Sequence, residues 1–213
     1  METLKLSGMN IGECAARAAE ILRAGGVVLY PTDTLYGLGA DAFSNEAVAK
    51  VYAIKSRETD KPIHCIVSDI EMAEKYAEVN DAARALAKAL LPGPLTLILK
   101  KNPNLGEGIA RDIETIGIRI PAHEFCTALA KEFGKPYTTT SANIAGELPK
   151  GSIEEIFTQL GENSEQIDLI VDGGKTSSTV PSTVVDVREE EPVIVREGAI
   201  SGAEIRRILG LPR

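Results

Sequence analysis

Short apolar runs that alternate with Ala-rich amphipathic stretches along the whole chain constrain the fold of this protein most strongly. Runs such as Val27–Tyr30, Leu95–Leu99 and Ile116–Ile120 have the length of buried strands. Stretches such as 12–24 and 123–133 place apolar residues at helical spacing. Because neither an internal repeat nor a linker interrupts the alternation, we expect one α/β domain, residues 1–213, around a mixed sheet.

The remaining elements follow from the same signals. Ser44 is a candidate helix cap, and Ser152-x-x-Glu155 and Ser201-x-x-Glu204 are capping-box patterns. Residues 101–114 are rich in Gly, Asn and charge and predict a long mobile loop. Further helices are expected at 69–77 and 81–91, and further strands at 62–67, 137–140, 167–171, 184–187 and 193–196.

Composition narrows the class of protein. Apolar residues make up 44% of the chain, and the formal net charge of −8 disfavours a protein whose whole surface grips nucleic acid. The three cysteines, Cys14, Cys65 and Cys126, form no metal-ligand spacing and are odd in number, which argues against a disulfide framework or a zinc site. We expect a cytoplasmic protein without a signal peptide or a membrane span.

Three cations lie within seven residues in Lys55-x-Arg57-x-x-x-Lys61, between a predicted helix and a predicted strand. Cations held close together repel one another, and a phosphate would relieve that cost. The alternative is that Lys55 and Arg57 complement the negative end of the preceding helix. The spacing alone leaves both interpretations open.

Polar side chains also follow several predicted strands. Hydroxyl or amide groups occupy five of the six positions from Thr138 to Asn143, where ligands of α/β sheets bind, although a Ser/Asn turn has the same composition. Arg119 interrupts an apolar strand and needs a partner or a ligand if it is buried, whereas an outward-facing arginine needs neither. Ser182 before one strand and Arg196 after another are weaker signals of the same kind.

Taken together, these motifs resemble the YrdC-like family of threonylcarbamoyl-AMP synthases. Six segments match in the family's order and cover about residues 15 to 209. They are Pro31-Thr32-Asp33-Thr34-x-Tyr36-Gly37-Leu38, Lys55-Ser56-Arg57 with Lys61, Gly117-x-Arg119-x-Pro121, Thr140-Ser141-Ala142-Asn143, Ser182-Thr183-Val184-Val185-Asp186 and Arg196-x-Gly198.

The resemblance implies a twisted mixed sheet with flanking helices and an open, positively charged cavity. It implies an enzyme, a nucleotidyltransferase that joins L-threonine, bicarbonate and ATP with Mg²⁺ and releases pyrophosphate. The product would serve the threonylcarbamoyl modification of adenosine-37 in tRNA, through hand-off to a tRNA threonylcarbamoyl-transferase complex and with a weak RNA contact.

The resemblance also implies roles for individual residues, with Lys55 and Arg57 as catalytic groups and no metal ligand. The implied ATP-binding residues are Lys55, Arg57, Lys61, Thr115, Ser141, Asn143 and Arg196. The implied threonine-binding residues are Thr34, His64, Arg119, Thr139 and Ser182.

Two other functions stay open at this point. The same fold occurs as a module of hydrogenase-maturation proteins that handle a carbamoyl-adenylate. A basic cavity would also suit an RNA-binding module, which the net charge and the few aromatic residues disfavour.

Overall fold

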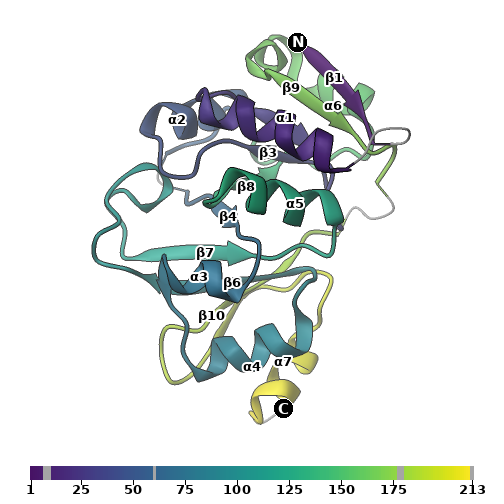
Figure 1. Cartoon of the computed structure of the whole chain (residues 1–213). Helices are drawn as coiled ribbons and strands as arrows, with labels where there is room; N and C mark the ends of the chain where they lie inside the picture. Colours follow the sequence, from purple (N-terminus) through teal and green to yellow (C-terminus); the bar gives the residue numbers. More distant parts are fainter. Residues whose placement is uncertain (7–10, 60, 177–179, 212–213) are drawn as a thin grey trace.

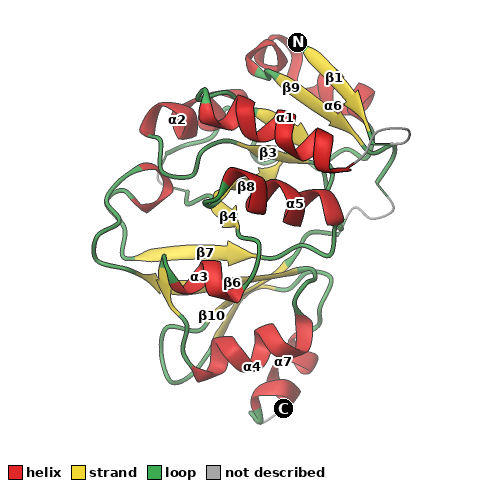
Figure 2. Ribbon diagram, in the orientation of Figure 1, coloured by secondary structure: helices red, strands yellow, loops and turns green. Residues whose placement is uncertain are grey.

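A computed structural model describes residues 1–6, 11–59, 61–176 and 180–211 of the chain. Within these ranges the strands join one mixed sheet in the order β1-β9-β2-β3-β8-β4-β7-β6-β10-β11, and β5 pairs with β6. Strands in different parts of the molecule, such as β1, β7 and β10, run in clearly different directions in Figure 2, as expected for a twisted sheet. No helix in the described part of the chain is both long and apolar enough to cross a membrane.

The sheet combines parallel and antiparallel pairs. β8 lies at its centre and pairs antiparallel with β3 on one side and with β4 on the other. Parallel pairs join β1 to β9, β2 to β9, β4 to β7 and β6 to β10. The strands are β1 (Glu2–Lys5), β2 (Val28–Tyr30), β3 (Gly37–Gly39), β4 (His64–Ile66), β5 (Ala77–Glu78), β6 (Leu95–Lys101), β7 (Thr115–Arg119), β8 (Tyr137–Ser141), β9 (Leu169–Asp172), β10 (Thr183–Asp186) and β11 (Val193–Arg196).

Helices cover the sheet, and Figure 1 shows α1 and α5 side by side near the N-terminal end and α4 beside α7 near the C-terminus. The predicted caps form, because the Oγ atoms of Ser44, Ser152 and Ser201 each accept a hydrogen bond from the backbone N–H three residues later. The α-helices are α1 (Ile11–Arg23), α2 (Asn45–Ile54), α3 (Ile70–Glu74), α4 (Asp81–Leu90), α5 (Glu124–Phe133), α6 (Ile153–Leu160) and α7 (Gly202–Leu209). Two 3₁₀ helices are η1 (Gly108–Ala110) and η2 (Gly161–Gln166).

Two apolar cores form on opposite faces of the sheet. Val28 and Tyr30 of β2 face the core that α1 and α5 cover, whereas Leu29 faces the core that contains α2. In β9, Ile170 likewise faces the core that contains α2, whereas Leu169 and Val171 face the core that α1 and α5 cover. Because side chains point to alternate faces of a strand, both faces must be apolar, which explains why these strands are continuous apolar runs.

The predicted elements are confirmed, with small differences at their ends, and three strands were missed. β1 and β5 are short, and β3 has the sequence Gly-Leu-Gly. The segment 101–114, predicted to be a mobile loop, contains η1 and makes defined contacts. Ile109 N–H donates to the Ala42 carbonyl at 2.9 Å, and Lys101 Nζ donates to the Ala110 carbonyl at 2.7 Å.

Candidate functional site

A polar cavity of about 120 Å³ lies where several strands end, and it gathers residues that are far apart in the sequence. Its lining comes from the loop between β2 and β3, the segment between α2 and β4, the residues just before β10, and parts of β3, β4, β6, β7, β8 and β11. The lining residues are Thr32, Thr34, Leu35, Tyr36, Gly37, Arg57, Pro62, Ile63, His64, Thr96, Arg119, Thr139, Thr140, Ser141, Pro181, Ser182 and Arg196.

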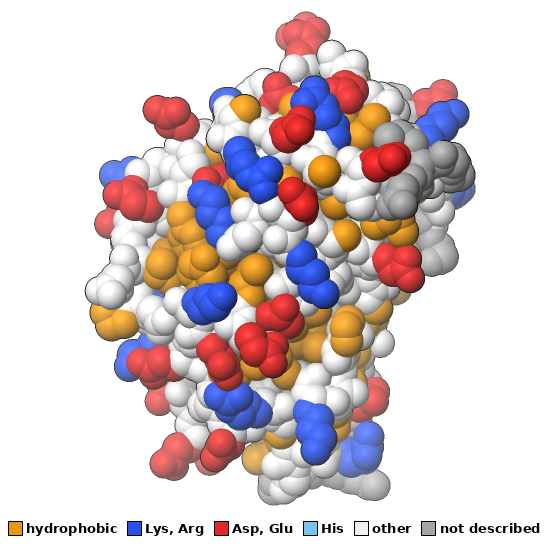
Figure 3. Space-filling model, viewed as in Figure 1, with side chains coloured by type: hydrophobic (Ala, Val, Ile, Leu, Met, Phe, Trp, Pro, Cys, Tyr) orange, Lys and Arg blue, Asp and Glu red, His pale blue; other side chains and the backbone are white. Residues whose placement is uncertain are grey.

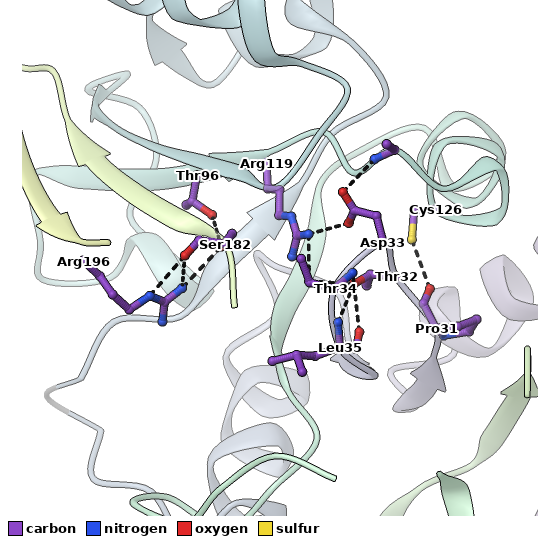
Figure 4. Close-up of polar contacts among 11 residues, drawn as sticks. Pro31, Thr32, Asp33, Thr34, Leu35, Thr96, Arg119, Cys126, Ser182 and Arg196 are labelled. Carbon is purple, nitrogen blue, oxygen red and sulfur yellow. Dashed lines mark hydrogen bonds and ion pairs between the residues drawn. The ribbon is translucent and has the colours of Figure 1, made fainter. Parts of the chain in front are cut away.

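The loop after β2 is held by its own side chains and by Arg119 (Figure 4). Thr32 Oγ1 accepts hydrogen bonds from the backbone N–H groups of Thr34 and Leu35, at 3.0 and 3.2 Å. The Cys126 thiol donates to the Pro31 carbonyl at 3.3 Å. These local bonds place the Thr34 hydroxyl against the cavity with little freedom to move.

Arg119 is the most deeply buried cation of the cavity, with 7% of its side chain exposed. Its Nη2 donates to Thr34 Oγ1 at 2.8 Å and forms an ion pair with Asp33. Its Nε is buried and has no hydrogen-bond partner among the described residues. A buried donor without a partner is costly, so an acceptor from a ligand that reached Nε would lower the free energy of the site.

Ser182, Thr96 and Arg196 form a second cluster of donors, which Figure 4 shows on the other side of Arg119. The hydroxyls of Ser182 and Thr96 lie 2.9 Å apart. Arg196 donates from Nη2 to the Ser182 carbonyl at 2.9 Å and to Ser182 Oγ at 3.3 Å. One hydroxyl proton of the pair therefore stays free for an acceptor in the cavity.

Within the described residues, the charged side chains that line the cavity are the arginines Arg57, Arg119 and Arg196. Arg57 donates to the backbone carbonyls of Lys61 and Pro62, at 3.2 and 3.1 Å. Burial, and then the charges of Arg119 and Arg57, lower the pKa of Arg196. Three guanidinium groups that repel one another across a small cavity favour an anionic ligand.

His64 lies in the cavity because Gly117 leaves room for its ring. A Cβ atom on Gly117 would lie 2.8 Å from His64 Cγ and 3.1 Å from Nε2, too close for any side chain. Burial, and then the charges of Arg196, Arg57 and Arg119, lower the pKa of His64 to about 4. The imidazole is therefore neutral near pH 7 and offers one donor and one acceptor.

Lys55 lies beside the cavity without lining it. Its Nζ donates to the Ser141 carbonyl, to the Asn143 carbonyl at 2.8 Å and to Asn143 Oδ1 at 3.2 Å. The side chain is buried, and burial followed by the charge of Arg57 lowers the pKa of Lys55 to about 7. All three ammonium donors are thus directed at the turn that carries Ser141.

The structure brings together eight of the twelve residues predicted for the site. Thr34, Arg57, His64, Arg119, Thr139, Ser141, Ser182 and Arg196 line the cavity. Four others do not. Lys55 and Asn143 support the Ser141 turn, Lys61 is 57% exposed and pairs with Glu58 at 2.8 Å, and Thr115 lies at the far end of β7 from Arg119.

Sequence reasoning gave no role to Thr96, which lines the cavity, or to Asp33, which pairs with Arg119. Thr96 lines the cavity from β6, but in the run Leu95–Leu99 it reads as an ordinary β-branched strand residue. Asp33 belongs to a matching motif without an expected role. Its one usable signal is a carboxylate placed between two threonines directly after a buried strand.

The fold and the cavity define an α/β protein with a polar cavity whose charged lining residues, among those described, are arginines. The sequence model of the family named for Sua5, YciO and YrdC, described as "Telomere recombination", matches residues 20–198. The chain therefore belongs to the Sua5–YciO–YrdC family.

Relatives in this family are similar over most of the chain. A Methanocaldococcus jannaschii protein with the provisional name threonylcarbamoyl-AMP synthase is 41% identical over 188 residues, 88% of this chain and 86% of that protein. The Bacillus subtilis threonylcarbamoyl-AMP synthase is 38% identical over 197 residues. The structure of Pyrococcus abyssi Sua5 complexed with L-threonine is 33% identical, with a TM-score of 0.89 over all of this chain. This chain spans 56% and 61% of the latter two proteins.

Proposed function

We propose that this protein is a threonylcarbamoyl-AMP synthase, which joins L-threonine, bicarbonate and ATP and releases pyrophosphate. The observation that carries the proposal is Arg119, a buried guanidinium whose Nε lacks a partner among the described residues. It lies in a hydroxyl-rich cavity beside Thr34. An α-carboxylate is the ligand that such a donor set suits, and the related Sua5 structure holds L-threonine.

The proposal divides the cavity between two substrates. The carboxylate and hydroxyl of threonine take the end formed by Thr34, His64, Arg119, Thr139 and Ser182. The phosphates of ATP take the end formed by Arg57, Ser141 and Arg196. Lys55 and Asn143 act on ATP indirectly, because they hold the turn that carries Ser141. Lys61 and Thr115, also expected to bind ATP, lie outside the lining, and their contact with ATP stays a prediction.

The chemistry needs positioning more than it needs a protein nucleophile. The threonine amine and bicarbonate condense to a carbamate with loss of water. A carbamate oxygen then forms a bond to the α-phosphorus of ATP, and the bond to the pyrophosphate group breaks. Two anions must meet for this step, so arginines that offset their charge and fix their orientation account for the catalysis.

We assign Mg²⁺ to ATP rather than to the protein. Among the described residues no group of three or more His, Cys, Asp and Glu side chains forms a metal site, and no carboxylate lines the cavity. Magnesium is often bound through substrate phosphates with few protein ligands, which suits a cavity of this kind. Bound there, it would offset charge on the phosphates.

We further propose that the unstable product passes in the cytoplasm to a tRNA threonylcarbamoyl-transferase complex. The alternatives are not favoured. Relatives up to 41% identical carry the synthase name, which argues against a carbamoyl-adenylate-handling module of hydrogenase maturation. Figure 3 shows acidic and basic side chains interspersed over the face that it draws, and on that face they form no continuous basic patch for RNA to contact.

Pyrophosphate release from ATP tests the proposal. The purified protein is assayed with Mg²⁺, in the presence and absence of L-threonine and of bicarbonate. We expect release that requires both. Turnover that is indifferent to threonine would favour carbamoyl-adenylate chemistry instead. Absence of turnover in a folded protein that binds ATP would contradict the proposal.

A further inference from the structure

The three cavity arginines differ in what completes their hydrogen bonds. Arg57 and Arg196 donate to backbone carbonyls and to the Ser182 hydroxyl, which are neutral acceptors. Among the described residues, Arg119 alone of the three pairs with a carboxylate, that of Asp33. Neutral acceptors satisfy donors but leave the charge in place, whereas a carboxylate offsets it.

Asp33 is itself held in place. Its side chain is 11% exposed, and its Oδ2 accepts the Ala122 backbone N–H at 3.1 Å while Oδ1 pairs with Arg119. It lies behind Arg119 and does not line the cavity. Asp33 and the cavity-lining Thr34 thus both accept from Nη2 of Arg119, and Nε has no partner among the described residues.

From this arrangement we propose that Asp33 is a positioning and specificity-determining residue, which reserves the Arg119 end of the cavity for a zwitterionic amino acid and excludes phosphate from it. The inference deepens the proposed function and rests on it. Asp33 holds Arg119 in one orientation, and its charge makes that end of the cavity a poor site for a polyanion.

The discrimination follows from the charges of the two ligands. The energy between Asp33 and a ligand at a given distance scales with the charge of that ligand. An amino acid carries one carboxylate and one ammonium group, so the repulsion of the first is partly offset by attraction of the second. Inorganic phosphate carries roughly one to two negative charges near neutral pH and no positive group, so Asp33 only repels it. Phosphates are therefore directed to Arg57 and Arg196.

Calorimetric titration of the whole chain tests the proposal, with L-threonine and inorganic phosphate as the two probes. In the unaltered protein, we expect phosphate to change the apparent Kd for threonine by less than about twofold. In Asp33→Asn, phosphate should compete with threonine. The ratio of the Kd for phosphate to the Kd for threonine should then fall by about tenfold or more. Asp33→Glu keeps the charge and should retain most of the discrimination while weakening threonine binding.

Asp41 provides a matched control. Its carboxylate also forms an ion pair, with Lys135 Nζ at 2.5 Å, and accepts a backbone hydrogen bond, from Phe43 N–H at 3.1 Å. Asp41 does not line the cavity. Asp41→Asn should leave the ratio unchanged. An unchanged ratio in Asp33→Asn, or an equal fall in Asp41→Asn, would overturn the proposal.

The remaining outcomes are equally decisive. If Asp33→Asn does not fold, Asp33→Glu and the unaltered protein suffice. Loss of discrimination in Asp33→Glu would overturn the inference, and so would strong competition by phosphate in the unaltered protein. If the unaltered protein binds no threonine, the proposed function fails. Direct phosphate titration then still decides the role of Asp33, since Asp33→Asn should gain a phosphate site.

Discussion

Replacing Gly117 by alanine should force His64 out of its position and damage both stability and threonine binding. The new Cβ would lie 2.8 Å from His64 Cγ, the ring atom nearest the backbone. Rotation about χ2 moves the outer ring atoms but leaves Cγ in place, so χ1 must change. The ring then moves off β7 into a cavity of about 120 Å³.

The magnitude follows from two opposing effects. Overpacking of this kind costs roughly 1–3 kcal/mol. Removing glycine from a strand returns about 0.5–1 kcal/mol of backbone entropy. We therefore expect a net destabilisation of about 1–2 kcal/mol in urea unfolding. An imidazole that occupies the threonine end should weaken threonine binding by about tenfold, which is ~1.4 kcal/mol.

A double substitution separates the clash from other effects. Gly117→Ala with His64→Ala removes the obstructing ring, so its destabilisation should be smaller than the sum of the single changes by about 0.5–3 kcal/mol. Gly106→Ala is the matched control, because a Cβ there meets no atom within 4 Å. Strict additivity in the double variant, or unaltered stability and binding in Gly117→Ala, would refute the reasoning.

Three further predictions concern neighbouring residues. Lys55→Met removes three hydrogen bonds from the Ser141 turn. It should destabilise the protein by about 3 kcal/mol in urea unfolding and abolish pyrophosphate release. Unchanged activity would contradict this. Thr96→Val keeps the shape but loses the bond to Ser182, and should raise the KM for threonine about fivefold, with little change in melting temperature. The pKa of His64 falls from 6.5 to about 4 on folding, so its protonation favours the unfolded state as pH drops through this window. Unfolding at pH 4 and pH 7 should show roughly 2–3 kcal/mol less acid sensitivity in His64→Gln than in the unaltered protein.

The fold was predictable to the extent that buried strands and capped helices leave local patterns. Runs apolar at every position indicated strands covered on both faces, and Ser-x-x-Glu patterns located α6 and α7. β3 was missed because Gly37 and Gly39 have no strand propensity. They fit there because the ring of Tyr30 occupies the space where their side chains would lie, a contact that only the folded sheet creates.

The site was predictable in its membership more than in its geometry. Polar residues at strand ends meet wherever those strands are neighbours, which explains why Arg119, Thr139 and Ser182 share one cavity. Spacing gave no indication that Lys55 bends toward the Ser141 turn while Arg57, two residues on, lines the cavity. That difference depends on where the acceptor carbonyls lie, and they come from β8 and the turn that follows it.

The electrostatics of the cavity likewise depend on acceptors rather than on composition. The chain carries a net charge of −8, yet the charged groups among the described lining residues are arginines. Backbone carbonyls complete the bonds of Arg57 and leave its charge available, whereas Asp33 offsets that of Arg119. Two adjacent sites of different character can therefore form from the same kind of side chain. An enzyme that must hold an amino acid and a nucleotide side by side requires that difference, because identical cationic sites would let phosphate occupy both.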